Sequence, residues 1–177
     1  TVRVYDWNGV EWVQKGLTLY GEHVYASTGE SVSLSSDGNV VAYGSPTSIE
    51  NGVVIGRVDV FAWDGSAWVP KGDPFFGTNS YCLAGTSVDL SGDGNVMTFG
   101  SPNHRNSQGD PTGLIYIFIW SGTIWTPLDD IEGQIASAGL GFSTKLSSSG
   151  NMMAYGTGKS VNEQGQDVSS GEVLRLI

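Results

Sequence analysis

Hydrophobic and polar residues alternate with a period of two in short segments that Gly-containing turns separate. The pattern is clearest at residues 31–35, where Val32 and Leu34 alternate with serines. Such alternation predicts a strand with one buried face. The Asp37-Gly38 turn leads into a second segment at 39–43, and Asp-Gly indicates a hairpin because Gly adopts positive φ without steric cost. A third segment spans 56–63 and a fourth begins at Trp68. No segment has a helical period, so the pattern predicts an all-β fold.

Two sequence blocks show that these segments repeat along the chain. Trp-x-Gly-x-x-Trp stands at residues 7–12 and recurs after 56 and then 57 residues, at 63–68 and 120–125. The block at 29–39 returns in step at 85–95 and again at 141–151. We name the strands of one period A to D. The fourth strand contains Pro in two copies, which favours an edge position because Pro donates no backbone hydrogen bond.

The period divides the chain into four units. We call residues 1–28 repeat I (strands C and D), 29–84 repeat II, 85–140 repeat III and 141–177 repeat IV (strands A to C). Repeated four-stranded antiparallel units of this length are typical of β-propeller blades. The sequence thus predicts about three blades of a larger propeller. A three-unit β-solenoid or stacked sheet array is the alternative.

An open row of blades leaves an apolar face bare at each end. If each bare face carries about 400 Å² of apolar surface, the lost stabilisation is roughly 10 kcal/mol per face at 25 cal/mol/Å². This loss rivals the whole stability of a domain. We therefore expect the chain to pack against further blades of the same chain, or to self-associate.

The A–B hairpin resembles that of the FG-GAP repeat, the blade type of integrin α propellers. The resemblance rests on residues 31–39 with Gly44-Ser45-Pro46, and on 87–95 with Gly100-Ser101-Pro102. It implies a propeller with extracellular or cell-surface adhesion as its role. The Phe-Gly that names the family is replaced in every copy, by Thr28-Gly29 in the first.

Family members often bind calcium in this hairpin through several spaced carboxylates. Calcium requires six to eight oxygen ligands. This chain offers only Asp37, then Asp93, then Ser149 at the turn. We interpret Asp37 and Asp93 as turn formers, and we expect no calcium and no other cofactor.

The composition excludes several classes of partner. Of 177 residues, 8 are Lys or Arg and 18 are Asp or Glu, which gives a net charge of −10. This balance argues against nucleic acid and against anionic membrane surfaces, since both require clustered basic residues. No apolar run is long enough for membrane insertion, and no signal-peptide pattern is present. The single cysteine, Cys82, forbids an internal disulfide and is expected to be a small buried or loop residue.

Residues that could carry chemistry favour structural roles. His23 and His104 lack metal-ligand spacing and are expected at the surface. Asp129-Asp130 with Glu132 is interpreted as a solvated acidic turn. A serine recurs in every copy of the A strand, which favours a structural role at the start of the strand: Ser31, Ser87 and Ser143. A tryptophan pair also recurs in every copy, at 7–12, 63–68 and 120–125. This recurrence favours core packing rather than sugar stacking.

The variable segments point to a binding surface. The B–C loops (47–55, 103–112, 159–170) and the D–A segments (22–28, 78–84, 134–140) differ among the copies. In a propeller blade these loops open on one rim, and such loops commonly bind ligands. Aromatic and Arg residues are favoured contacts, and the candidates are Tyr25, Tyr81, His104 and Arg105.

The resulting hypothesis is a non-catalytic recognition or adhesion module for a protein or carbohydrate ligand. Two alternatives stay open. One is a propeller-fold hydrolase or lyase with its site at the ring centre, and the other is a purely structural spacer.

Overall fold

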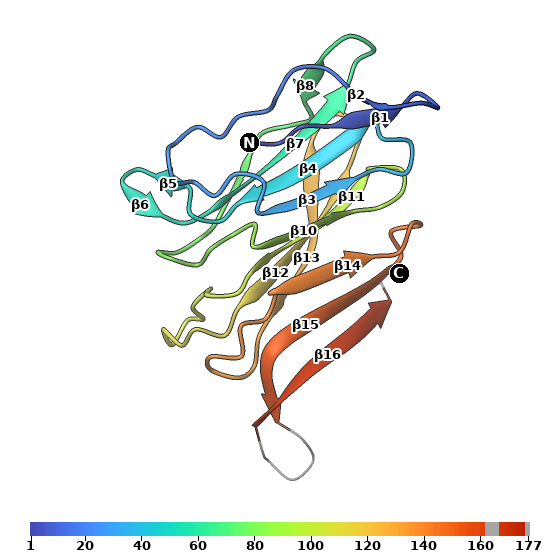
Figure 1. Ribbon diagram of the computed structural model, residues 1–177. Coiled ribbons are helices and arrows are strands. Elements are labelled where there is room, and N and C mark those ends of the chain that lie inside the picture. The colour runs from blue at the N-terminus through green and yellow to red at the C-terminus, as the bar shows by residue number, and fades with distance from the viewer. Residues whose placement is uncertain (162–166, 176–177) are drawn as a thin grey trace.

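The computed structural model describes residues 1–161 and 167–175, with side chains described through residue 157. This part of the chain contains strands and no helix, so the all-β prediction is confirmed. The strands form several antiparallel sheets, none of which is closed. The sheets are stacked in chain order, from β1–β2 at one end to β14–β16 at the other (Figure 1).

Repeats II and III each form one main sheet whose four principal strands follow the order of the chain. Each has the four main strands that the pattern predicted. Repeat II contains β3 (Ser31–Leu34), β4 (Val40–Ser45), β7 (Arg57–Trp63) and β8 (Trp68–Pro70). Repeat III contains β10 (Ser87–Leu90), β11 (Val96–Ser101), β12 (Leu114–Trp120) and β13 (Trp125–Glu132). The two Pro-containing strands, β8 and β13, lie at sheet edges as predicted.

Repeats I and IV form smaller sheets. Repeat I contains β1 (Tyr5–Trp7) and β2 (Trp12–Gln14). Repeat IV contains β14 (Ser143–Leu146), β15 (Met152–Val161) and β16 (Asp167–Arg175). The B–C loop expected at 159–170 is therefore largely strand where it is described, and residues 162–166 lie outside the described part.

The sequence pattern did not predict three short strands, because each has only two residues. In repeat II, β5 (Ile49–Glu50) and β6 (Val53–Val54) form a small hairpin within the B–C loop. After strand D of the same repeat, β9 (Phe75–Phe76) pairs with β7.

The A–B turns explain the recurring Ser-x-Asp-Gly-Asn pattern. Asp37 Oδ1 accepts hydrogen bonds from Ser35 Oγ at 2.6 Å and from the Asn39 backbone N–H at 3.0 Å. These bonds to the charged carboxylate lower the pKa of Asp37 to about 2. Asp93 makes the same two bonds in repeat III. Both residues thus form turns, as interpreted.

The core lies between consecutive sheets. The largest cluster joins repeats II and III, where Phe99 stacks on Tyr116 and Phe118. Cys82 is fully buried in this cluster, as expected. A smaller cluster joins repeats I and II, and another joins repeats III and IV through Ile115, Ile117 and Met153.

The recurring serines tie neighbouring sheets together at strand A. Ser31 Oγ donates to Gly85 O, and Ser87 Oγ donates to Gly141 O, each at 2.8 Å. Each serine begins a strand A and bonds to the next repeat. The structural interpretation of these serines is therefore confirmed for these two copies.

Candidate functional site: the loop rim of repeats II and III

The variable loops of repeats I to III lie together along one side of the stack of sheets, on the left of Figure 1. Hydrogen bonds join D–A segments to B–C loops: Tyr81 N donates to Val54 O at 2.6 Å, and Ser137 N donates to Pro111 O at 2.8 Å. Thr47 Oγ1 similarly donates to Tyr25 O at 2.6 Å. Side chains on these loops therefore project from a hydrogen-bonded frame.

The D–A segments share a left-handed backbone that directs tyrosines outward. Tyr25, Tyr81 and Ser137 have φ of 70°, 56° and 62°, and the residues two positions later are left-handed as well. This conformation costs a non-glycine residue roughly 1–2 kcal/mol, so the surrounding bonds must hold it. Tyr25 is 91% exposed and Tyr81 is 66% exposed.

Two cavities adjoin on the rim around repeat III. One, of about 350 Å³, is lined by Ser80, Tyr81, Asn103, Arg105 and Pro111. The other, of about 320 Å³, is lined by Pro102, Asn103, Pro111, 137–139 and Phe142. They share Asn103 and Pro111 and therefore adjoin, and we call the two together the rim site. An aromatic ring borders each half.

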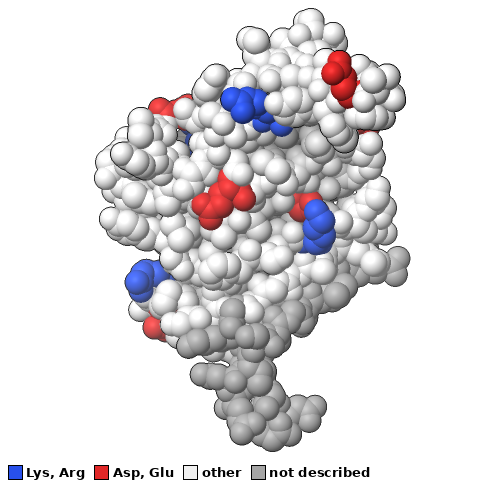
Figure 2. All heavy atoms as spheres, in the orientation of Figure 1, with Lys and Arg blue, Asp and Glu red and all other residues white. Residues whose placement is uncertain are grey.

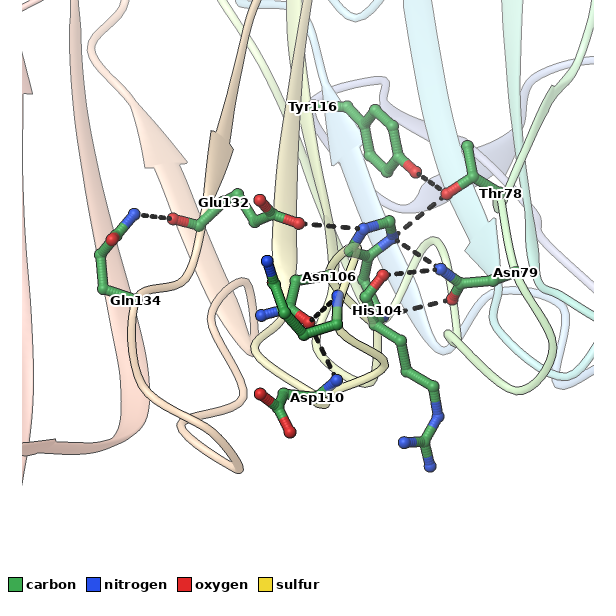
Figure 3. A network of polar contacts seen from close by, with 10 residues as sticks. Thr78, Asn79, His104, Asn106, Asp110, Tyr116, Glu132 and Gln134 are labelled. Carbon is green, nitrogen blue, oxygen red and sulfur yellow. Dashed lines mark hydrogen bonds and ion pairs between the residues drawn. The ribbon is translucent and has the colours of Figure 1, made fainter.

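His104 lies beneath this site rather than at the open surface where the sequence placed it. Its side chain is only 12% exposed. Its Nδ1 lies 3.1 Å from Thr78 Oγ1, and its Nε2 lies 3.5 Å from a Glu132 carboxylate oxygen (Figure 3). Burial lowers the pKa of His104, although Glu132 acts in the opposite direction. Its spacing in sequence could not reveal these partners, because they come from a loop and a strand far along the chain.

Asn79 fixes the backbone that carries Arg105. Its Nδ2 donates to Arg105 O at 3.1 Å, and its Oδ1 accepts from the Arg105 N–H at 3.3 Å (Figure 3). The guanidinium of Arg105 donates to Gly109 O at 2.7 Å. The structure thus brings together three of the four candidates, with Tyr81 and Arg105 lining the cavity and His104 supporting the loop. Tyr25 lies on the rim at the junction of repeats I and II and lines neither cavity.

The acidic segment of repeat III is a strand rather than the turn expected. Asp129 and Asp130 lie within β13, opposite Ile117 and Tyr116. Burial raises the pKa of Asp130, and the neighbouring Asp129 adds to the shift. A bulge leaves Leu128 as an extra residue in β13, and pairing with β12 continues past Pro127 through the acidic residues to Glu132.

The enzymatic alternative was placed at the centre of a propeller ring, and the described sheets form no closed ring. One buried carboxylate, Asp89, lies on strand A of repeat III beside a cavity of about 370 Å³. Asp89 accepts bonds from Ser33 Oγ at 2.8 Å, from Lys145 Nζ at 2.7 Å and from the Leu146 N–H at 2.6 Å. Because these donors come from repeats II and IV, Asp89 ties repeat III to both of its neighbours. On the face of the molecule shown in Figure 2, charged side chains are few and scattered.

Within the described residues, no three His, Cys, Asp or Glu side chains converge on a position for a metal ion. The same residues contain no helix that could cross a membrane.

Comparison with family models and with curated protein sequences finds no match. The likeness to the FG-GAP repeat therefore stays a prediction from the motifs, and the case for a function rests on the geometry of the rim.

Proposed function

We propose that this chain is a non-catalytic recognition module, built of propeller-type blades, that binds a protein or carbohydrate ligand at the rim site. The role is adhesion or ligand capture at the cell surface or outside the cell. The observation that carries the proposal is the pair of adjoining cavities between variable loops, bordered by Tyr81 and Arg105.

The chemistry of the rim site suits recognition. Tyr81 offers an exposed ring for stacking, and Phe142, 59% exposed, offers another at the far end. Aromatic rings are enriched in binding surfaces because they bury large areas with few rotatable bonds, and guanidinium groups because they donate several hydrogen bonds in a fixed planar geometry. Holding Tyr81 and Arg105 before binding reduces the entropy lost on association.

The test begins with the labelled full chain on arrays of neutral oligosaccharides and of peptides. The strongest probe is then titrated against the Tyr81→Ala/Arg105→Ala variant. We expect affinity to fall at least about tenfold, equivalent to about 1.4 kcal/mol.

Tyr25→Ala is the matched control, because Tyr25 has the same left-handed backbone and high exposure but lies outside both cavities. Its affinity should be unchanged. Equal affinity of the double variant and the parent chain would contradict the proposal. Turnover in a broad hydrolase and lyase screen would favour the enzymatic alternative instead.

A further inference from the structure

The tryptophan pairs of repeats II and III each hold a Lys-Gly dipeptide from the preceding repeat. Lys15 Nζ lies 5.5 Å from the Trp63 ring centre and 5.8 Å from that of Trp68. Lys71 Nζ lies 5.3 Å from both rings of the next pair, Trp120 and Trp125. Such distances are within the range of cation–π attraction.

Hydrogen bonds fix the same dipeptides at both ends. Trp68 Nε1 donates to Lys15 O at 2.8 Å, and Trp125 Nε1 donates to Lys71 O at 2.6 Å. The ammonium groups continue to the A–B turn of the repeat they contact, where Lys71 Nζ donates to Gly94 O and Asn95 Oδ1. We call this arrangement the Lys-Gly clasp.

Glycine is required in the clasp because the backbone lies directly on the indoles. A Cβ on Gly16 would lie 2.6 Å from Trp63 Cζ3, and a Cβ on Gly72 would lie 2.7 Å from Trp125 Cδ1. Both glycines also have positive φ, 72° and 86°. A larger residue would therefore push the strand off the rings.

Repeat I contains the equivalent tryptophan pair, Trp7 and Trp12, and no Lys-Gly dipeptide among the described residues packs on it. Trp7 is 54% exposed and Trp12 is 67% exposed, whereas Trp68 is 9% exposed. The ring centres of Trp7 and Trp12 lie 5.6 Å apart at 57°, close to the 5.4 Å and 62° of Trp63 and Trp68. The open pair is thus already arranged as the covered pairs are.

We propose that the Trp7–Trp12 face is a docking site for a repeat hairpin of the Trp-x-x-Lys-Gly type. The Lys-Gly dipeptide of the partner would take the place that Lys15-Gly16 takes on Trp63 and Trp68, with Trp12 Nε1 donating to the lysine carbonyl. A second copy of this chain is a poor occupant. Its two Lys-Gly dipeptides, at 15–16 and 71–72, are both already engaged.

The test extends the full chain by one and a half repeats. We join two copied segments ahead of Thr1, first residues 29–84 and then residues 29–56. The second segment ends at residue 56 because Thr1 stands at the position that Arg57 has in repeat II. This addition supplies the A and B strands of repeat I and a complete preceding repeat. We expect hydrogen exchange at the Trp12 indole N–H to slow by at least about 100-fold.

The control is the same extended chain with Lys71→Glu and Gly72→Val in the added repeat only, where Trp12 should exchange as fast as in the parent. The proposal would be overturned if the Trp12 indole N–H were protected equally in both extended chains, or if it were protected in neither of them. Concentration-dependent protection in the parent chain would also overturn it, because a second copy would then cover the face.

A peptide arm keeps the proposal testable if the extended chain fails to fold. The peptide of residues 63–77 is titrated into the ¹⁵N-labelled full chain, so that only the chain's own indole signals are seen. A saturable shift at Trp12, absent with the Lys71→Glu/Gly72→Val peptide, supports the proposal. No shift at millimolar peptide contradicts it.

Discussion

Identical tryptophan pairs stand in a covered and an open environment within this molecule. Trp63 and Trp68 of repeat II hold a lysine, a glycine and a carbonyl from repeat I, whereas Trp7 and Trp12 are exposed. The geometry within the pairs is nearly the same. The difference shows that the hairpin itself arranges the rings, and that the clasp supplies the contact between repeats.

The largest effect is expected from removing an indole at the covered and the open pair. Trp68→Ala leaves a cavity and an unbonded Lys15 carbonyl, and should lower the free energy of unfolding by about 3–5 kcal/mol. Trp12→Ala should cost less than about 1 kcal/mol, because most of that ring already faces solvent. Urea unfolding of the two variants measures both values, and equal losses would abolish the comparison.

Filling the glycine of the clasp should have the next largest effect. Gly72→Ala forces a Cβ against Trp125 at a positive φ, and should cost about 3 kcal/mol. Gly65→Ala is the matched control, since its φ is 103° but nothing lies within 4 Å of its Cβ. That variant should lose only about 1–2 kcal/mol, the cost of the backbone conformation alone, and thermal unfolding compares the pair. If Gly65→Ala costs as much, backbone strain rather than the ring contact explains the glycine.

Replacing the lysine of the clasp sharpens the comparison further. Lys71→Met removes the cation–π attraction and two hydrogen bonds but keeps the apolar stem, and should cost about 1 kcal/mol. Burial lowers the pKa of Lys71, so part of the lost attraction is offset by relieved desolvation. Lys15→Met should give a similar loss in chemical denaturation, because Lys15 makes the equivalent contacts. A gain in stability would show that desolvation outweighs the attraction.

The smallest effect concerns the acidic turns beside the clasps. The pKa of Asp37 falls from 3.8 to about 2 on folding, so its stabilising contribution is complete above pH 4 and is lost as the pH falls towards 2. Repeat IV carries Ser149 at this place. The Asp37→Ser/Asp93→Ser variant should therefore lose less stability than the parent chain between pH 4 and 2. Circular dichroism measures unfolding of the two chains across this pH range. An unchanged acid slope would assign that loss to other carboxylates.

The sequence predicted the parts of this structure that depend on local pattern. Asp37-Gly38 predicted a hairpin because the bonds that shape it lie within five residues. The recurrence of Ser31 predicted a strand start, and β3 begins there. Cys82 is buried, which is one of the two placements that its residue type predicted. The sequence could not distinguish Trp12 from Trp68, because the motifs are the same and only the neighbouring repeat differs.

The sequence predicted that the variable loops gather on one side of the molecule, but it did not predict the cavities between them. Variability among the copies located the loops, and Tyr81 and Arg105 do line a cavity there. His104 was misplaced because its burial depends on Thr78 and Glu132, which approach it only through folding. The short strands β5, β6 and β9 were missed because two residues show no alternation.

The most direct test of the clasp is hydrogen exchange at the indole N–H groups of the parent chain. Our account predicts slow exchange at Trp68 and Trp125, whose N–H groups are bonded to Lys15 and Lys71, and fast exchange at Trp12 at every protein concentration. Equal protection of all three indoles, or fast exchange at Trp68 and Trp125, would contradict it.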